Sequence, residues 1–202
     1  MAAAVSASPA MAQSINYASN GNFIGYWGPS SSGNQFYGEA FVAPNSNIAD
    51  FSLTVSTASP GDSFSFVAQI YAFSGSSSNE TLVGPALYTS AVQTIASTDF
   101  TTFTFDPNVA LTQGDTYIAL VTNDPNGTSL GGSGYGIMES GSGGPGQFYY
   151  GYATGSFYKY GADAAFVADF NAGANPVPEP AAVALLGAGL VGLAGLRTRR
   201  RT

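Results

Sequence analysis

The stretch SFSFVAQIYAF, from Ser63 to Phe73, is apolar along both of its sides. Successive side chains of a β-strand point to opposite faces of the sheet, so alternation divides this stretch into two sets. One set is Phe64, Phe66, Ala68 and Ile70, and the other is Val67, Gln69, Tyr71 and Phe73. A strand with two apolar faces must be covered on both sides, which predicts a central strand of a β-sandwich.

Further segments on either side of this stretch show the same two-residue period. The clearest are FSLTVS (51–56), TFTF (102–105), YIALVTN (117–123) and AAFVADFN (164–171), and weaker candidates are residues 38–42, 86–94, 135–139 and 148–154. The segments between them are rich in Gly, Pro, Asn, Asp and Ser, which favour turns. We therefore predict an all-β fold over residues 13–174, an antiparallel β-sandwich of jelly-roll type with eight to ten strands. The order of these segments resembles the jelly-roll domains attached to bacterial surface anchors, which implies a fold but no particular ligand.

The composition excludes several kinds of chemistry. The 202 residues include no His and no Cys, so a Ser-His-Asp triad, a Cys-His pair, a zinc finger and a disulfide are all impossible within the chain. Twelve acidic residues stand against five basic ones, and four of those five lie in the last six residues. Residues 13–176 therefore hold eleven acids and one lysine, a net charge of −10. Such a body repels phosphate backbones, which excludes nucleic acid as a partner.

Residues 181–196, AAVALLGAGLVGLAGL, contain no charged or strongly polar side chain. As a helix they would be about 24 Å long, just enough to cross a hydrocarbon core of about 30 Å when the flanks are included. We predict one C-terminal transmembrane helix here, followed by a basic cytoplasmic tail at residues 197–202. Its stop-transfer residues are Arg197, Arg199, Arg200 and Arg201. The positive-inside rule then places the folded body outside the inner membrane.

Residues 175–180, directly before this span, end in Pro178-Glu179-Pro180. Two prolines around one glutamate cannot continue a helix or join a central strand, so the segment is predicted to be extended and accessible. A Pro-Glu-Pro, a short apolar helix and an arginine cluster in this order resemble the PEP-CTERM sorting signal of Gram-negative bacteria. The resemblance implies processing by exosortase, a membrane protease-transpeptidase, and an association with exopolysaccharide and biofilm. It also implies a membrane-anchored precursor that ends at the outer surface or outside the cell.

The first twelve residues are rich in alanine and end in Ala10-Met11-Ala12. Small residues at this spacing fit a signal peptidase, which would cut between Ala12 and Gln13. The basic and long apolar parts of a complete signal peptide are missing from residues 1–12, which we interpret as a partial signal peptide. Either translation begins further upstream or the similarity is accidental.

Aromatic residues are dense in several segments and are candidates for binding glycans. Sugar rings stack on flat aromatic side chains, so an exposed Tyr and Trp surface would suit a polysaccharide. The candidate stacking residues are Trp27, Tyr149, Tyr150 and Tyr152. The alternative is that these rings pack inside the sandwich, because aromatic residues are also favoured in strands.

The acidic residues give no recognisable catalytic or metal site. Asp62, Asp124, Asp163 and Asp169 lie in or near turns and could ligate calcium, but no spacing matches a calcium loop, so we assign no metal and no cofactor. No carboxylate pair of the glycosidase kind is recognisable, so we assign no catalytic residue. We expect an exported, non-enzymatic surface or matrix protein with a structural or adhesive role. The alternatives are a secreted carbohydrate-binding module and a glycan-active hydrolase.

Overall fold

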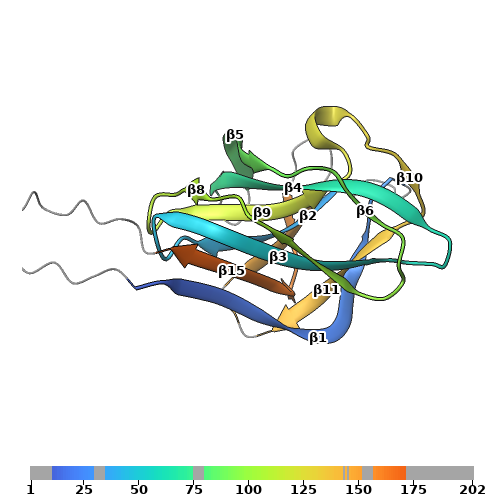
Figure 1. The fold of residues 1–202 in the computed structure, drawn as a ribbon, viewed down its shortest axis with the longest axis horizontal. Helices are drawn as coiled ribbons and strands as arrows, with labels where there is room; N and C mark the ends of the chain where they lie inside the picture. Colours follow the sequence, from blue (N-terminus) through green and yellow to red (C-terminus); the bar gives the residue numbers. More distant parts are fainter. Residues whose placement is uncertain are drawn as a thin grey trace, which may run out of the picture. The chain divides into compact units, whose positions relative to one another are not determined.

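A computed structural model describes residues 11–29, 35–74, 80–142, 144, 146–151 and 157–171. Met11–Ala172 forms one compact unit. It consists of two antiparallel β-sheets packed face to face, with one 3₁₀ turn at Pro125–Gly127 (Figure 1). The predicted all-β, antiparallel sandwich is therefore confirmed.

The first sheet has the strand order β14-β11-β1-β15-β3-β7, and β8 pairs with β3 beside β7. Strand β11 also pairs with β3, at Val55–Thr57, directly after the part of β3 that pairs with β15. The strands are β1 (Gln13–Trp27), β3 (Asn47–Thr57), β7 (Thr101–Phe105), β8 (Val109–Ala110), β11 (Gly136–Ser142), β14 (Asp163–Ala164) and β15 (Phe166–Asn171).

The second sheet has the strand order β10-β4-β9-β2-β12-β13, and β5 and β6 pair with β4. Its strands are β2 (Phe36–Val42), β4 (Ser63–Ser74), β5 (Thr81–Thr89), β6 (Gln93–Ile95), β9 (Thr116–Thr122), β10 (Gly132–Ser133), β12 (Gln147–Gly151) and β13 (Phe157–Lys159). The chain crosses repeatedly from one sheet to the other, as β1, β2, β3 and β4 do in turn, which is the connectivity of a jelly roll.

The main hydrophobic core lies between the sheets and follows the predicted alternation. On β4, the side chains of Phe64, Phe66, Ala68 and Ile70 are all fully buried in it. On β3 and β15 the alternating apolar residues Phe51, Leu53, Val55, Phe166, Ala168 and Phe170 face the same core. Burying a side chain of this size stabilises the fold by about 1.5–3 kcal/mol, so this core is the main source of stability.

A second hydrophobic cluster lies on the opposite face of the second sheet. It is made of Ala40, Phe73, Ile118, Leu120, Tyr149 and Phe157, all of them buried. Strands β4 and β9 are therefore covered on both faces, as the two-sided pattern of residues 63–73 and 117–123 predicts. The hydroxyl of Tyr149 donates a hydrogen bond to Glu80 Oε1 at 2.9 Å at the edge of this cluster.

The structure corrects the sequence prediction in three places. The described residues form fifteen strands rather than eight to ten, because several are only two or three residues long. Strand β1 was not predicted, since its polar middle, ASNGN (18–22), interrupts the alternation. The strand predicted at 86–94 is divided between the end of β5 and the start of β6, because the chain breaks its pairing with β4 between Thr89 and Gln93.

The predicted domain limits can be compared only in part with the structure. The predicted Pro-Glu-Pro segment, transmembrane helix and basic tail lie outside the described residues. Within the described residues, the structure has no helix of the length and apolar character that a bilayer crossing requires.

Candidate functional site

Trp27 does not belong to an exposed platform, which corrects the prediction for this residue. Its side chain is completely buried at the end of β1. Its ring contacts those of Phe64 and Phe66 edge-on, at centroid distances of 5.1 and 5.9 Å. A ring enclosed in this way has no free face for a sugar, so Trp27 is a core residue.

The other three predicted stacking residues do not form one exposed surface either. Tyr149 is 6% exposed and belongs to the second hydrophobic cluster, so it is also a core residue. Tyr150 is partly buried against the main core, and its ring is stacked on that of Tyr158 at 5.5 Å. Tyr152 lies outside the described residues. The neighbours Tyr149 and Tyr150 point to opposite faces because strand residues alternate.

An exposed group of aromatic rings does exist, but on the first sheet. Phe23 and Tyr26 on β1 are 54% and 50% exposed, and Tyr135, just before β11, is 40% exposed. The ring of Tyr26 lies between the other two, with centroid distances of 5.8 Å to Phe23 and 5.7 Å to Tyr135. We call these three residues the aromatic strip. Sequence reasoning missed it because plain alternation cannot tell which of Tyr26 and Trp27 faces outward.

A buried polar cluster lies around Glu39 on β2, whose side chain is fully buried. The backbone N–H of Ala164 donates to its Oε2 at 2.9 Å, while Oε1 has no hydrogen-bond partner among the described residues. Burial raises the pKa of Glu39 to about 9, and the nearby charge of Asp163 acts in the same direction. The carboxyl group of Glu39 is therefore protonated at neutral pH.

Tyr17 and Asp163 complete this cluster. Burial, with smaller effects from Glu39 and Asp163, raises the pKa of Tyr17 to about 12. Burial also raises the pKa of Asp163, whereas a hydrogen bond from the backbone of Gly144 lowers it by a smaller amount. Gly146 is packed so tightly here that a Cβ atom would lie 2.5 Å from the Tyr17 hydroxyl. Two carboxyl groups with raised pKa values thus lie near one tyrosine, an arrangement that the sequence did not suggest.

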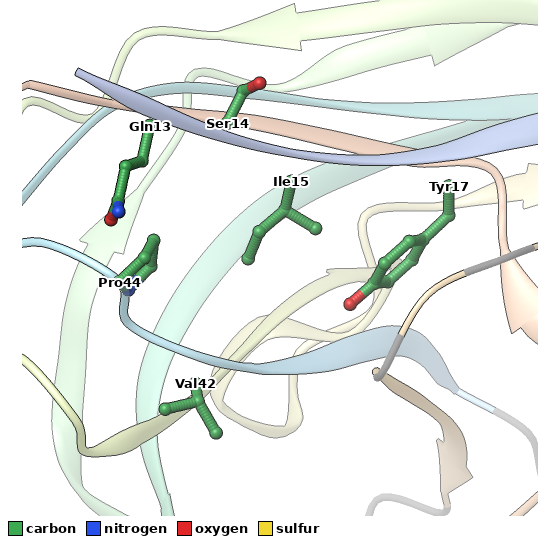
Figure 2. Close-up of a pocket in the computed structure, with 6 residues that line it drawn as sticks. All are labelled: Gln13, Ser14, Ile15, Tyr17, Val42 and Pro44. Carbon is green, nitrogen blue, oxygen red and sulfur yellow. The ribbon is translucent and has the colours of Figure 1, made fainter. Parts of the chain in front are cut away.

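A cavity of about 450 Å³ opens at the end of the sandwich beside this cluster. It is lined by Gln13, Ser14, Ile15, Tyr17, Val42 and Pro44. Ile15 and Tyr17 point from β1 toward β2, whereas Ser14 points to the other side of β1 (Figure 2). The lining includes neither Glu39 nor Asp163, so the cavity gives a ligand no direct path to either carboxyl group.

The four aspartates considered for calcium are distributed over different strands and turns. Asp163 belongs to the Glu39 cluster, and Asp169 on β15 pairs with Ser14 on β1 and with Asp50 on β3. Burial, together with the charges of Asp169 and Asp106, raises the pKa of Asp50. The part of the chain that the structure describes contains no group of three or more acidic side chains arranged to hold a metal ion.

The predicted signal-peptide cleavage site lies at the start of the first strand. Ala12 and Gln13 are both exposed, and Gln13 pairs with Phe170 as the first residue of β1. Cleavage between them would leave every strand intact. It would remove the Met11 carbonyl, which accepts a hydrogen bond from Asn45 Nδ2 at 2.8 Å.

Comparison with known protein families finds a match at the C-terminal end of the chain. The family model of the PEP-CTERM protein-sorting motif matches residues 176–201, a range that includes Pro178, Glu179, Pro180 and the predicted arginine cluster. None of the curated proteins is significantly similar to this chain. A structure of the infectious bursal disease virus Gx strain is similar at 16% identity and a TM-score of 0.35. The similarity covers 86% of this chain and 36% of the viral chain, so this chain spans about a third of the viral one.

Proposed function

We propose that the β-sandwich is a non-enzymatic structural or adhesive domain of the extracellular matrix, associated with exopolysaccharide. The observation that carries this proposal is the PEP-CTERM motif at residues 176–201. This motif identifies an exported protein that is sorted by a C-terminal signal, with exosortase as its processing partner and a membrane-anchored precursor. Signal peptidase is the second processing enzyme in the proposal, and the outer surface or the extracellular matrix is the final location.

The burial of Glu39 supports a role without catalysis. A general acid or base must reach the atoms that react. Glu39, the carboxyl group with the most strongly raised pKa, exposes no surface and does not line the cavity. Its environment is that of a structural group inside the sandwich, which favours a binding or structural role over that of a glycan-active hydrolase.

A carbohydrate-binding module remains the second candidate, and the aromatic strip favours it. The rings of Phe23, Tyr26 and Tyr135 are each about half exposed and lie next to one another, so they form one apolar area on the surface. Binding to polysaccharide and a structural role in the matrix are compatible, because a matrix protein can act by holding glycan chains.

Two C-terminal variants in an exosortase-bearing Gram-negative host test the sorting part. Deletion of residues 177–202 should release the unprocessed body into the medium. A variant with Pro178, Glu179 and Pro180 all changed to Ala keeps the apolar span and should accumulate as an uncleaved membrane protein. Intact-mass analysis of the medium, membrane and matrix fractions distinguishes these products. Surface attachment of the deletion variant would contradict the proposed route.

The matrix role is tested in the same host by removing residues 13–174 while the two ends are kept. We expect a weaker biofilm, measured as the matrix mass that survives a defined shear. A variant of the full chain with Asp99 changed to Asn, an exposed position, serves as the control and should leave biofilm unchanged. Biofilm of normal mass and strength without the β-sandwich would overturn the structural role.

A further inference from the structure

The aromatic strip owes its existence to irregular pairing in β1. The register between β1 and β11 shifts twice, once between Ser19 and Phe23 and again between Phe23 and Tyr26. Figure 1 shows β1 turning sharply toward its C-terminal end. In a regular strand, residues three positions apart point to opposite faces. Here Phe23 and Tyr26 both point outward while Ile24 and Trp27 are both buried, which is the effect of a β-bulge.

The bulge places Ile24 and Trp27 together on the inner side of the sheet and leaves Phe23 and Tyr26 together on the outer side. Gly25, between them, lies so close to the second sheet that a Cβ atom would be 2.8 Å from the Tyr37 hydroxyl. That hydroxyl donates to the Tyr26 carbonyl at 2.9 Å and so fixes the backbone of Tyr26. Phe23 and Tyr26 are therefore held on a strand whose backbone is fixed by the second sheet, which is how a preorganised binding surface is built.

Polar groups lie at the Phe23 end of the strip. Glu139 on β11 is the cross-strand partner of Phe23, and its carboxylate accepts a hydrogen bond from the Ser19 hydroxyl. Asn22 is exposed directly before Phe23. Glu139 itself is only 7% exposed, so the polar groups that a ligand can reach here are the Ser19 hydroxyl and the Asn22 amide. Hydroxyl and amide groups beside exposed rings match the chemistry of a sugar, which presents C–H faces to rings and hydroxyl groups to polar partners.

The charge and the ring angles narrow the ligand class. The net charge of −10 over residues 13–176 disfavours an anionic polysaccharide, because like charges repel across an interface. Neighbouring rings of the strip are inclined by 48° and 62°, so they cannot lie together on a flat crystalline face. We infer that Phe23, Tyr26 and Tyr135 form a binding surface for a single chain of a neutral polysaccharide. This inference rests on the proposed matrix function and names its site.

The other group of exposed tyrosines suits this role less well and provides a matched control. Tyr158 and Tyr160 are 44% and 45% exposed, close to the values of the strip. The ring of Tyr158 is stacked on that of Tyr150 with only 23° between the planes, so one face of each ring is already occupied. Substitutions at Tyr158 and Tyr160 remove two rings of similar individual exposure at the second sheet.

Affinity electrophoresis of the full chain in mild detergent tests the inference. The probes are hydroxyethylcellulose, laminarin and galactomannan as neutral chains, alginate as a polyanion and, in a pull-down, crystalline cellulose. We expect at least one neutral soluble chain to retard the wild type, at low and high salt alike, and alginate and crystalline cellulose to bind weakly. The triple variant Phe23→Ala, Tyr26→Ala, Tyr135→Ala should lose roughly tenfold or more in affinity, in proportion to the stacking that is removed.

The variant Tyr158→Ala/Tyr160→Ala should bind as the wild type does. Thermal melting of each variant shows whether the triple variant has kept its fold; if it has not, the single variant Phe23→Ala replaces it and should also bind more weakly than the wild type. Unchanged binding of a folded triple variant, or loss only in the Tyr158/Tyr160 variant, would overturn the site but leave the matrix function standing. A wild type that binds no neutral chain would overturn both the site and the polysaccharide part of the proposed function.

Discussion

The two halves of β1 belong to one strand but are built differently. The first half, Gln13–Tyr17, pairs with β15 in an unbroken register that runs from Phe170 to Phe166. The second half, Phe23–Trp27, pairs with β11 through a bulge. The regular half buries only Tyr17 completely, whereas the bulged half buries Ile24 and Trp27 and exposes Phe23 and Tyr26. The difference shows that irregular pairing lets five consecutive residues serve both the core and the surface.

Each half also anchors the sandwich with one aromatic ring, and the surroundings of the two rings differ. Trp27 lies among the rings of Tyr37, Phe64 and Phe66. Tyr17 lies beside the carboxyl groups of Glu39 and Asp163 as well as the ring of Phe166. The stability contributed by the Trp27 end should therefore not depend on pH, whereas that of the Tyr17 end should.

The largest expected effect comes from removing the aromatic anchor of the bulged half. Trp27→Ala would leave a large cavity among fully buried rings, and substitutions of this kind cost about 3–5 kcal/mol in the free energy of unfolding. Urea denaturation of the full chain in detergent, followed by tyrosine fluorescence, measures this loss. The same loss should be found at pH 5 and pH 8. A loss under about 1 kcal/mol would mean that the second half of β1 is not part of the core.

The second effect tests the polar anchor of the regular half, through Glu39→Gln. The pKa of Glu39 is raised from 4.5 in the unfolded chain to about 9 in the folded protein. The stability that the protonated Glu39 carboxyl group contributes to the fold is fully present below about pH 4.5, and it is lost as the pH rises toward 9. Between pH 4.5 and pH 7 the free energy of unfolding of the wild type falls by up to about 3 kcal/mol. A neutral glutamine at this position avoids this loss.

We therefore expect Glu39→Gln to be more stable than the wild type at pH 8 and equal to it near pH 4. Denaturation midpoints of both proteins across this range measure the difference. Asp99→Asn, which removes an exposed charge, is the control and should follow the pH dependence of the wild type. A constant difference between Glu39→Gln and the wild type at all pH values would show that Glu39 is ionised in the fold.

Sequence alone predicts the regular parts of this molecule and fails at the irregular ones. Alternation assigns Phe64 and Phe166 to the correct face, because β4 keeps a constant register with β9 and the first part of β15 keeps one with β3. It cannot separate Tyr26 from Trp27, because that choice depends on a bulge set by pairing with β11. The meeting of Glu39 and Asp163 depends on how β2 and β14 are brought together by the topology, which no local pattern contains.

A smaller effect is expected for Tyr26→Ala, one residue from Trp27. Half of this side chain is already in water, and its ring contacts those of Phe23 and Tyr135, which are themselves largely exposed. Its removal should cost less than about 1 kcal/mol in the free energy of unfolding. The same urea titration that is used for Trp27→Ala measures it. A cost equal to that of Trp27→Ala would show that the strip is structural rather than a surface available to a ligand.

The smallest effect tests the registers themselves, by placing a lysine in each half of β1. Ser14 is exposed and pairs directly with Asp169, and Asp169 also lies opposite Asp50 on β3. Ser14→Lys should therefore form a cross-strand ion pair with Asp169 and reduce the repulsion between Asp169 and Asp50. The expected gain is about 0.5 kcal/mol at low salt, and it should fall in 1 M salt because exposed charges are screened. Asn22→Lys lies within the first register shift, between Ser19 and Phe23, where no residue of β11 is paired with it, and it should give no such salt-dependent gain. Equal gains at both positions would mean that net charge, and not the regular register of the first half, determines the effect.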